Sequence, residues 1–413
     1  MRASEKPKNL KQNNTRVILD LLRNQETVSV AEISSQIGLS KTTVKKLVDS
    51  LVALNLAASV GKGESTMEGG KKPELYRFHK NYGYVLGLHV TPDALIAVTT
   101  DLRADITYYA KHAIQPDRSL QAVIDQLVAM IHSISGMKEA NGGEKLIGIV
   151  VALPGLVDPA AGVSIYSPHY HAWGRNVPFL ALLRQNLGDA ANMPLFLGNV
   201  NRFQAIAEKE KGIAGGVDNF LIVDALEDGL GAGIILHGKL INGNQSLAGE
   251  IGHMTLDSRE GPVCNCGNKG CFEALVSAKR ILAMAREAQR AGRDSRLFRG
   301  ADPEELTLAA VCENAARGDA LCRELVAEAV RWFVIGFANI IMVADPDLIV
   351  VQGVYGKAGD FFLERLREGL KNTGLPDVEK RIRIEHSVMG EERGVIGGAV
   401  TVISDFFARR LKF

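Results

Sequence analysis

The side chains with the most specific chemistry in this sequence are one histidine and three cysteines within nineteen positions. They are His253, Cys264, Cys266 and Cys271. Zn²⁺ prefers sulfur and nitrogen ligands in a tetrahedron, and a complete set of protein ligands leaves no open position for water. Gly267 and Gly270 allow the loop to fold tightly around an ion. The spacing therefore predicts a structural Zn²⁺ site; the alternative is three buried free cysteines beside an unrelated histidine.

The first eighty residues carry a basic excess that the rest of the chain lacks. They contain 14 Lys and Arg against 8 Asp and Glu, a charge of +6, whereas the remainder has 34 against 39, a charge of −5. Basic side chains on one surface gain affinity for phosphates by releasing counterions. The asymmetry favours a polyanion as the partner of this segment alone, although an ordinary solvated surface can have the same composition.

Helical periodicity predicts three short helices in this segment. Their apolar positions are Val17, Ile18, Leu21 and Leu22, then Ile33 and Ile37, then Val44, Leu47, Val48, Leu51 and Val52. Ser29 and Glu32 have the spacing of a capping box, in which each side chain satisfies a free backbone amide at a helix start. Gly38 is expected to end the second helix, and Ser40 to cap the third.

This arrangement predicts a winged helix-turn-helix domain over residues 1–80, with the third helix in a DNA major groove. Residues 57–60 and 75–78 are the expected wing strands, whose tip could follow a minor groove or a phosphate. The candidate DNA-contacting residues are Ser40, Lys41, Thr42, Thr43, Lys45 and Lys46 in the helix, and Lys71 and Lys72 in the wing. A module for protein contacts is the alternative.

From residue 81 onward the pattern is that of an α/β protein. The expected strands are 84–89, 94–100, 106–113, 146–153, 220–225, 232–236 and 348–351, with helices at 120–134 and from 274 onward. This order predicts two α/β lobes, at 81–200 and 201–392, with a ligand cleft between them. A C-terminal helix at 393–410 is expected to return to the first lobe.

The composition, with 46% hydrophobic and 23% charged residues, is that of a globular protein of about two to three domains. We find no apolar run near the ~20 residues that span a bilayer, and the start lacks the apolar core of a signal peptide. We expect a cytoplasmic protein with no membrane partner. In a reducing compartment the cysteines indicate metal rather than disulfides, and Cys312 and Cys322 are expected only to pack in a helical core.

Residues 250–253 and 264–273 resemble the signature of the ROK (repressor, ORF, kinase) family, Glu-x-Gly-His followed by Cys-x-Cys-Gly-x-x-Gly-Cys-x-Glu. The resemblance extends over residues 80–405, and the regulator branch of the family is similar to residues 10–80 as well. It implies an actin-like (ribonuclease H-like), duplicated body that binds a sugar in its cleft, with zinc shaping the pocket. The sugar contacts that it implies are Asn199, Glu250, His253 and Glu273, with Asn176 as a further hydroxyl partner.

Two parts of the family's kinase machinery are missing from this sequence. ROK kinases carry Glu-Asn-Asp at the end of a strand, where the Asp acts as general base, and Val200 stands at the Asp position here. The first phosphate loop, Asp-x-Gly-Gly-Thr, is replaced by His-Val-Thr-Pro-Asp at 89–93. Gly-rich turns at 228–233 and 353–356 are kept, but glycines at a hairpin are more often structural. We therefore expect a sugar sensor that is not an enzyme.

Residues 169–176 resemble the segment that covers the family's pocket, and 154–158 its Pro-Gly-x-x-Asp turn. Within the covering segment, Trp173 could stack on the apolar face of a sugar. Arg175 could meet a phosphorylated inducer.

Together these features predict a DNA-binding transcriptional regulator, expected to be a repressor, of sugar-utilisation genes. A homodimer or homotetramer would place two recognition helices on a pseudo-palindromic double-stranded operator, and a sugar or sugar phosphate would close the cleft. An activator with the opposite coupling sign is equally allowed. The alternatives are a bifunctional sugar kinase and a regulator controlled by docking of a sugar-transport protein.

Overall fold

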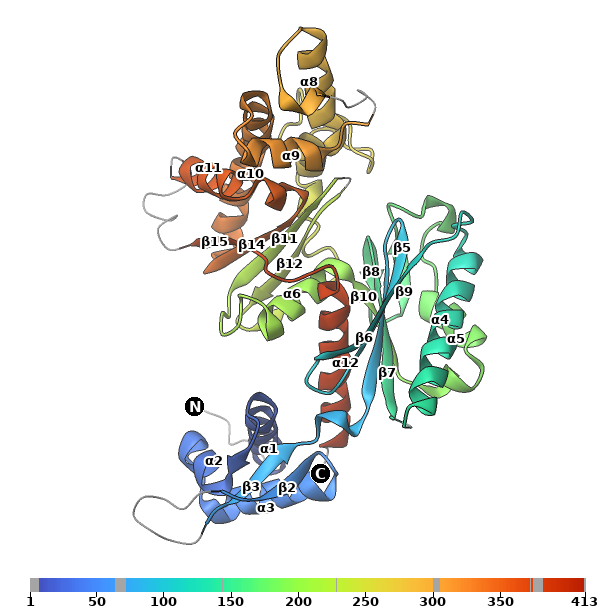
Figure 1. Cartoon of the computed structure of the whole chain (residues 1–413), viewed down its shortest axis with the longest axis vertical. Helices are drawn as coiled ribbons and strands as arrows, with labels where there is room; N and C mark the ends of the chain where they lie inside the picture. Colours follow the sequence, from blue (N-terminus) through green and yellow to red (C-terminus); the bar gives the residue numbers. More distant parts are fainter. Residues whose placement is uncertain are drawn as a thin grey trace.

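The computed structural model describes residues 7–63, 72–142, 144–227, 229–299, 305–371, 373 and 382–411. Figure 1 shows a small N-terminal body and two α/β lobes, with one long helix, α12 (Arg393–Arg410), between the lobes. Each lobe is built on a five-stranded mixed sheet. The two-lobed α/β architecture expected from the sequence is confirmed.

The N-terminal body is a winged helix-turn-helix. It contains the helices α1 (Pro7–Asn24), α2 (Val30–Ile37) and α3 (Lys41–Ala53), and the strands β1 (Val28–Ser29), β2 (Ala57–Lys62) and β3 (Glu74–Phe78). The strands form one antiparallel sheet of order β1-β3-β2. The apolar stripes of the helices pack with Tyr76 and Phe78 of β3 into a common core. Lys71, predicted at the wing tip, lies outside the described residues.

The signals that the sequence carries at the helix ends are confirmed. Ser29 Oγ accepts a hydrogen bond from the Glu32 amide at 3.2 Å, and Glu32 Oε2 accepts one from the Ser29 amide at 2.7 Å. Gly38 ends α2 with a φ of 69°, a left-handed conformation that glycine adopts without strain. Ser40 Oγ accepts the amide of Thr43 at 3.2 Å. These caps fix where α2 ends and where α3 begins.

The first lobe holds a sheet of order β10-β7-β4-β5-β6. Its strands are β4 (Tyr84–Val90), β5 (Ala94–Thr100), β6 (Ile106–Ala113), β7 (Leu146–Leu153) and β10 (Leu195–Asn199), and a ribbon of β8 (Leu156–Asp158) and β9 (Val163–Tyr166) follows β7. β4, β5 and β6 form an antiparallel meander, whereas β7 and β10 run parallel to β4. The helices α4 (Leu120–Ala140) and α5 (Phe179–Asn186) lie on the side of this sheet away from α12 (Figure 1).

The second lobe repeats this topology. Its sheet has the order β15-β14-β11-β12-β13, again with an antiparallel meander and two parallel strands beside it. The strands are β11 (Phe220–Leu226), β12 (Gly229–Leu236), β13 (Lys239–Leu240), β14 (Leu348–Gly353) and β15 (Arg383–His386). The helices are α7 (Phe272–Val276), α8 (Ala278–Arg290), α9 (Leu308–Ala316), α10 (Ala320–Ala344) and α11 (Asp360–Leu370). The matching strand order is the duplication that the sequence resemblance implies.

The helix α10 is the core helix of the second lobe. Among the described residues it is the one helix long and apolar enough to cross a membrane, and more than half of its most apolar stretch is buried. The expectation that no such run exists was therefore wrong about α10. The ring of Phe333 packs edge-on against Phe272 and Phe362, each at 5.2 Å between centroids, and against Tyr355 at 5.1 Å. This aromatic cluster explains the hydrophobicity of α10 by packing.

The helices α6 (Val200–Lys211) and α12 lie against each other between the lobes (Figure 1). α12 packs on the sheet of the first lobe, because a Cβ atom at Gly87 of β4 would lie 2.1 Å from Val395 Cγ1. α6 packs on the sheet of the second lobe, because a Cβ atom at Gly233 of β12 would lie 2.3 Å from the Asn201 carbonyl oxygen. Glycine at these positions therefore permits the helices to reach the two sheets closely.

Candidate functional site

The predicted zinc ligands lie between β12 and α7. His253 ends the short 3₁₀ helix Ile251–His253, and the three cysteines follow it in the loop that leads to α7. A Cβ atom at Gly249 would lie 2.1 Å from the Ala232 carbonyl oxygen, and one at Gly252 would lie 2.2 Å from that of Leu230. The chain before His253 therefore runs directly against β12, a path that only glycine permits. This contact holds His253 over the end of the second sheet.

The four predicted ligands converge on one point. Their ligand atoms all lie within 4.8 Å of one another. Cys266 Sγ lies 3.6 Å from Cys271 Sγ, and Cys264 Sγ lies 3.9 Å from His253 Nδ1. Ligands about 2.0–2.3 Å from a tetrahedral zinc ion are separated by about 3.5–3.8 Å. The cluster could therefore bind a metal ion such as zinc.

The surroundings of the cysteines fit a cation. Burial raises the pKa of the Cys271 thiol to about 12 and also raises that of Cys264, whereas hydrogen bonds with Asn268 and the other two thiols outweigh desolvation and lower the pKa of Cys266. Thiols in such a place stay protonated unless a metal ion displaces their protons. Gly270 has a φ of 71°, and a Cβ atom there would lie 1.6 Å from the Asp257 carbonyl oxygen. The loop is thus closed as tightly around the cluster as glycine allows.

Two carboxylates lie beside this cluster. Glu273, in the first turn of α7, accepts a hydrogen bond from the Leu230 amide at 3.0 Å, and its other oxygen lies 3.8 Å from Cys264 Sγ. Glu250 is half-buried. Burial raises the pKa of the Glu250 carboxyl group, while the charges of His253 and Arg202 oppose that rise. The structure therefore brings Glu250, His253 and Glu273, three of the five predicted sugar contacts, into one place.

Asn199 ends β10 and caps α6. Its side chain is 4% exposed. Oδ1 accepts the Arg202 amide at 3.2 Å, and Nδ2 donates to the Gly155 carbonyl oxygen at 2.7 Å. One amide proton of Asn199 remains for a ligand. Val200, which the sequence comparison set against the kinase base, is the first residue of α6 and is 8% exposed.

The segment predicted to cover the pocket is only partly as expected. Asn176 is exposed in the first lobe, with a φ of 55° that asparagine tolerates. Trp173 is 8% exposed, its ring stacks on Tyr170 at 4.2 Å between centroids, and its Nε1 donates to the Arg118 carbonyl oxygen at 2.9 Å. The suggested stacking of Trp173 on a sugar does not hold, because its ring is buried against Tyr170 in the core of the first lobe. The guanidinium of Arg175 lies 5.1 Å from the Tyr166 ring centroid.

The turns compared with phosphate loops have structural roles. The turn after β4 is closed by Thr91, whose Oγ1 accepts the Ala94 amide at 2.9 Å. A Cβ atom at Gly231 would lie 1.9 Å from Asn201 Nδ2, and one at Gly353 would lie 2.1 Å from the Ala225 carbonyl oxygen. Asp228 lies outside the described residues. Packing between elements therefore explains these two glycines without a phosphate.

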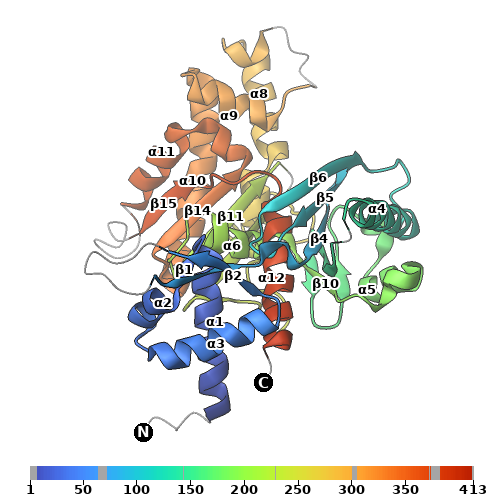
Figure 2. The ribbon, with the colours of Figure 1, turned by 60° about the horizontal axis from the view of Figure 1, so that its bottom comes forward.

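Four of the eight predicted DNA-contacting residues, all on α3, line a groove of about 510 Å³ between the helices and the wing. It is lined by Val30, Ala31, Lys41, Thr42, Lys45, Lys46, Pro73, Glu74 and Tyr76. Figure 2 shows α3 and α2 beside the small sheet. Lys41, Thr42 and Lys46 are exposed, as is Lys72 at the base of the wing. The sequence pattern did not indicate Glu74 or Tyr76, which reach the groove through the pairing of β3 with β2.

Three of these residues also make contacts within the domain. Ser40 Oγ and Thr43 Oγ1 lie 2.9 Å apart at the start of α3. Lys45 forms an ion pair with Asp49, and its Nζ lies 5.7 Å from the Tyr76 ring centroid. Lys41 and Lys46 are thus the lysines of α3 whose described contacts leave them most available to a phosphate.

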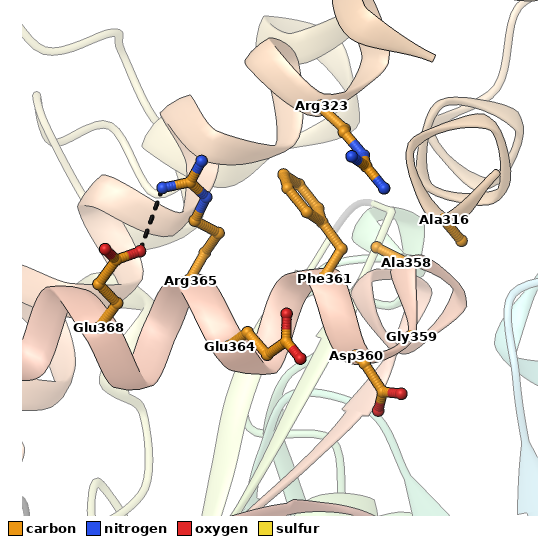
Figure 3. A pocket seen from close by; sticks show the side chains of 9 residues that line it. All are labelled: Ala316, Arg323, Ala358, Gly359, Asp360, Phe361, Glu364, Arg365 and Glu368. Carbon is orange, nitrogen blue, oxygen red and sulfur yellow. Dashed lines mark hydrogen bonds and ion pairs between the residues drawn. The ribbon is translucent and has the colours of Figure 1, made fainter. Parts of the chain in front are cut away.

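A second hollow of about 600 Å³ lies between α10 and α11 and was not predicted. Figure 3 shows the ring of Phe361 between the guanidinium groups of Arg323 and Arg365, which lie 5.0 Å and 5.9 Å from its centroid. Asp360 and Glu364 lie on the same side of α11. Neither this hollow nor the groove at α3 is lined by a predicted sugar contact.

Comparison with known proteins identifies the family. The model described as the ROK family matches residues 92–405. The chain belongs to the ROK family. Residues 16–61 match the IclR helix-turn-helix domain, which confirms the predicted DNA-binding fold at the N-terminus of this ROK protein.

Relatives that align over nearly the full length of the chain include transcriptional regulators. The xylose repressor of Caldicellulosiruptor bescii is 28% identical over 401 residues, which cover 97% of each chain. The DNA-binding transcriptional dual regulator NagC of Escherichia coli K12 is 27% identical over 400 residues, 95% of this chain and 93% of NagC. A ROK family transcriptional regulator described as a homologue of the E. coli MLC protein superposes with a TM-score of 0.82 at 24% identity, over 97% of this chain and 98% of that one.

Proposed function

We propose that this ROK protein is a transcriptional repressor of sugar-utilisation genes, with operator DNA bound by the winged helix-turn-helix and a sugar bound beside the metal cluster. The observation that carries the proposal is the presence of both parts in one chain that aligns over 97% of its length with a xylose repressor. D-xylose is therefore the first sugar to test. In this proposal the DNA-binding domain is residues 1–80, and the two lobes of the sugar-binding body are residues 81–200 and 201–392.

The cluster of His253 and the three cysteines would hold Zn²⁺, which would act as a structural ion. The ligands belong to the loop between Glu250 and Glu273, so holding that loop fixes both carboxylates. Nδ1 of His253 faces the cluster, which leaves Nε2 as a hydrogen-bond donor for a sugar. The residues present therefore fit a zinc ion and give it a role in shaping the ligand site.

The sugar would be held mainly by hydrogen bonds. Glu250 and Glu273 have carboxylate oxygens that accept from hydroxyl groups, and Asn199 has one free amide proton. Asn176, on the first lobe, would contact a sugar when the two lobes close on it. Burial of Glu250 strengthens each such hydrogen bond, because less water competes for the carboxylate.

Val200 argues against the alternative function, a sugar kinase. An aliphatic side chain neither accepts a proton from a sugar hydroxyl nor orients it. Thr91 and Pro92 stand where the family's first phosphate loop has glycines, and the turn is closed on itself. We therefore expect no sugar-dependent consumption of ATP by the purified protein.

A thermal-shift screen of the zinc-loaded protein tests the proposal. Free D-xylose, D-glucose and N-acetylglucosamine and their phosphates are compared, because a ligand that binds only the folded state raises the melting midpoint. The sugar site is supported if Glu250→Ala abolishes the shift and Glu364→Ala leaves it intact. Glu364 is an exposed residue of α11. A DNA duplex selected by the protein from a random library then shows whether the same sugar weakens DNA binding. No shift with any sugar contradicts the proposed sensor.

A further inference from the structure

The helix α6 connects the ligand site with the winged helix-turn-helix. At its start, the buried guanidinium of Arg202 donates to the carbonyl oxygens of Ser246 and Ala248, in the loop that leads to Glu250. At its end, Glu210 Oε1 accepts a hydrogen bond from Arg23 Nη2 of α1 at 3.1 Å. One helix of 12 residues therefore touches the ligand loop with its first turn and the DNA-binding domain with its last turn.

Side chains fix α6 to the sheet of the second lobe. Gln204 Nε2 donates to Asp224 Oδ2 of β11 at 2.9 Å, and Gln352 Nε2 of β14 donates to Gln204 Oε1 at 2.6 Å. All three side chains are 4% exposed. Buried hydrogen bonds of this kind are costly to break, because each partner would be left unsatisfied. These hydrogen bonds tie α6 to the second sheet, while Val200 and Phe203 on its other side pack against the first lobe and α12.

The first lobe and α12 hold the winged helix-turn-helix by separate contacts. Arg103, in the turn after β5, donates to the Gln25 carbonyl oxygen at 2.7 Å, at the C-terminal end of α1. Arg410 of α12 donates to the Leu54 carbonyl oxygen at 3.2 Å, and the rings of Phe78 and Phe407 meet at 6.1 Å between centroids. These contacts would keep the DNA-binding domain on the first lobe and α12 when the second lobe moves.

Arg23 is placed where all of these parts meet. Its side chain is 13% exposed. Besides Glu210, it contacts the turn of the first lobe, since Nε donates to the Leu102 carbonyl oxygen at 3.3 Å, and the guanidinium lies 5.7 Å from the Phe407 ring centroid. Next to Glu210, Lys211 pairs with Asp105 of the same turn at 2.8 Å. A shift of α6 against the first lobe must therefore change the environment of Arg23.

We propose that the Arg23–Glu210 pair transmits the state of the sugar site to the DNA-binding domain through α6. This inference rests on the sugar-controlled DNA binding proposed above. Movement of the ligand loop acts on Arg202, α6 carries the displacement, and Glu210 shifts the free energy of the position that α1 holds. Sugar affects DNA affinity only as far as it favours one of these arrangements, and DNA affects sugar affinity by the same factor.

The test compares Glu210→Gln with Glu324→Gln. Each change removes a second-lobe carboxylate from an ion pair with an arginine. Glu324 pairs with Arg293 at 2.7 Å and has no described contact with α6 or the winged helix. For each protein, the dissociation constant of the selected DNA duplex is measured with and without saturating D-xylose, or the sugar that shifts the melting midpoint. The ratio of the two constants measures the coupling.

We expect the effect of sugar on DNA affinity to be smaller in Glu210→Gln, with the ratio reduced towards one by a factor of roughly three or more. Changes of this size are typical of residues that carry coupling between sites. Sugar affinity without DNA should stay within about twofold of the unchanged protein, since Glu210 does not touch the ligand loop. Glu210→Asp, which keeps the charge, should recover part of the ratio. An unchanged ratio in Glu210→Gln overturns the proposal.

If no sugar changes the DNA affinity of the wild-type protein, the proposed function is wrong. Hydrogen exchange then tests the Arg23–Glu210 contact independently of any sugar. In that case the last turn of α1 should exchange faster in Glu210→Gln than in Glu324→Gln. Equal exchange in the two variants would show that Glu210 does not restrain α1, and it would overturn the role given to the pair.

Discussion

A Cβ atom added at Gly397 of α12 would lie 1.7 Å from the carbonyl oxygen of Phe203 in α6. The two helices between the lobes therefore touch backbone to backbone. Gly394 makes a similar approach to Val200, whose Cγ2 would lie 2.7 Å from a Cβ atom there. Small residues on α12 thus set how closely α6 approaches it, and with it the separation of the two sheets that the helices cover.

Gly397→Ala should destabilise the protein by about 1–3 kcal/mol, because backbone atoms rather than a flexible side chain must give way. Gly136→Ala, in α4, is the matched control, since nothing lies within 4 Å of a Cβ atom there. That control should be neutral or stabilising by about 0.5–1 kcal/mol, as alanine favours the helix. Denaturant unfolding of both variants measures the difference, and equal stabilities would mean that the helices separate easily.

Removal of the metal should destabilise the second lobe. Cys271→Ser should lose bound zinc, measured by elemental analysis, and unfold at a lower temperature, with a loss of at least about 2 kcal/mol. A chelator should have the same effect on the unchanged protein. Cys312→Ser changes a buried cysteine in α9 outside the cluster, so that variant should keep its zinc. Zinc retained by Cys271→Ser would show that the four residues do not form the site.

Lys41 and Lys46 should each contact a DNA phosphate. Replacing either with alanine should weaken binding of the selected duplex and reduce the slope of log affinity against log salt by about 0.9. Lys279→Ala, on α8 at the far end of the second lobe from the DNA-binding domain (Figure 1), is the control and should leave both quantities unchanged. Titrations at several salt concentrations measure the slopes. An unchanged slope in Lys41→Ala and Lys46→Ala would place the DNA on another surface.

His89 should make the protein sensitive to acid. Burial, and then the charge of Arg393, lower its pKa from 6.5 to about 4, while Glu391 opposes this shift. Between these two pH values His89 is protonated in the unfolded chain but not in the folded chain. The free energy of unfolding therefore falls as the pH drops from about 6.5 towards about 4. Between about pH 7 and pH 5 the unchanged protein should lose about 2 kcal/mol more than His89→Gln. Identical pH profiles would show that His89 titrates normally in the folded state.

Several wrong or missing predictions share one physical cause. Trp173 was assigned to a sugar from its place in a loop, but the chain folds it onto Tyr170, so packing decided its role. The hydrophobicity of α10 was missed, and most of its apolar residues are buried against other elements of the second lobe. In both cases the deciding neighbours come from contacts that a local pattern does not contain.

The sequence by itself determined the features that depend on near neighbours. The capping box of Ser29 and Glu32, the turn at Gly38 and the strands β4–β7 follow from residues a few positions apart, and the cluster of one histidine and three cysteines follows from one short segment. The tertiary structure alone decided which distant groups meet. Arg23 and Glu210 are separated by 187 residues, and Gln352 and Gln204 by 148. Such pairs form because packing of whole elements, rather than local backbone preference, brings their side chains within hydrogen-bond distance.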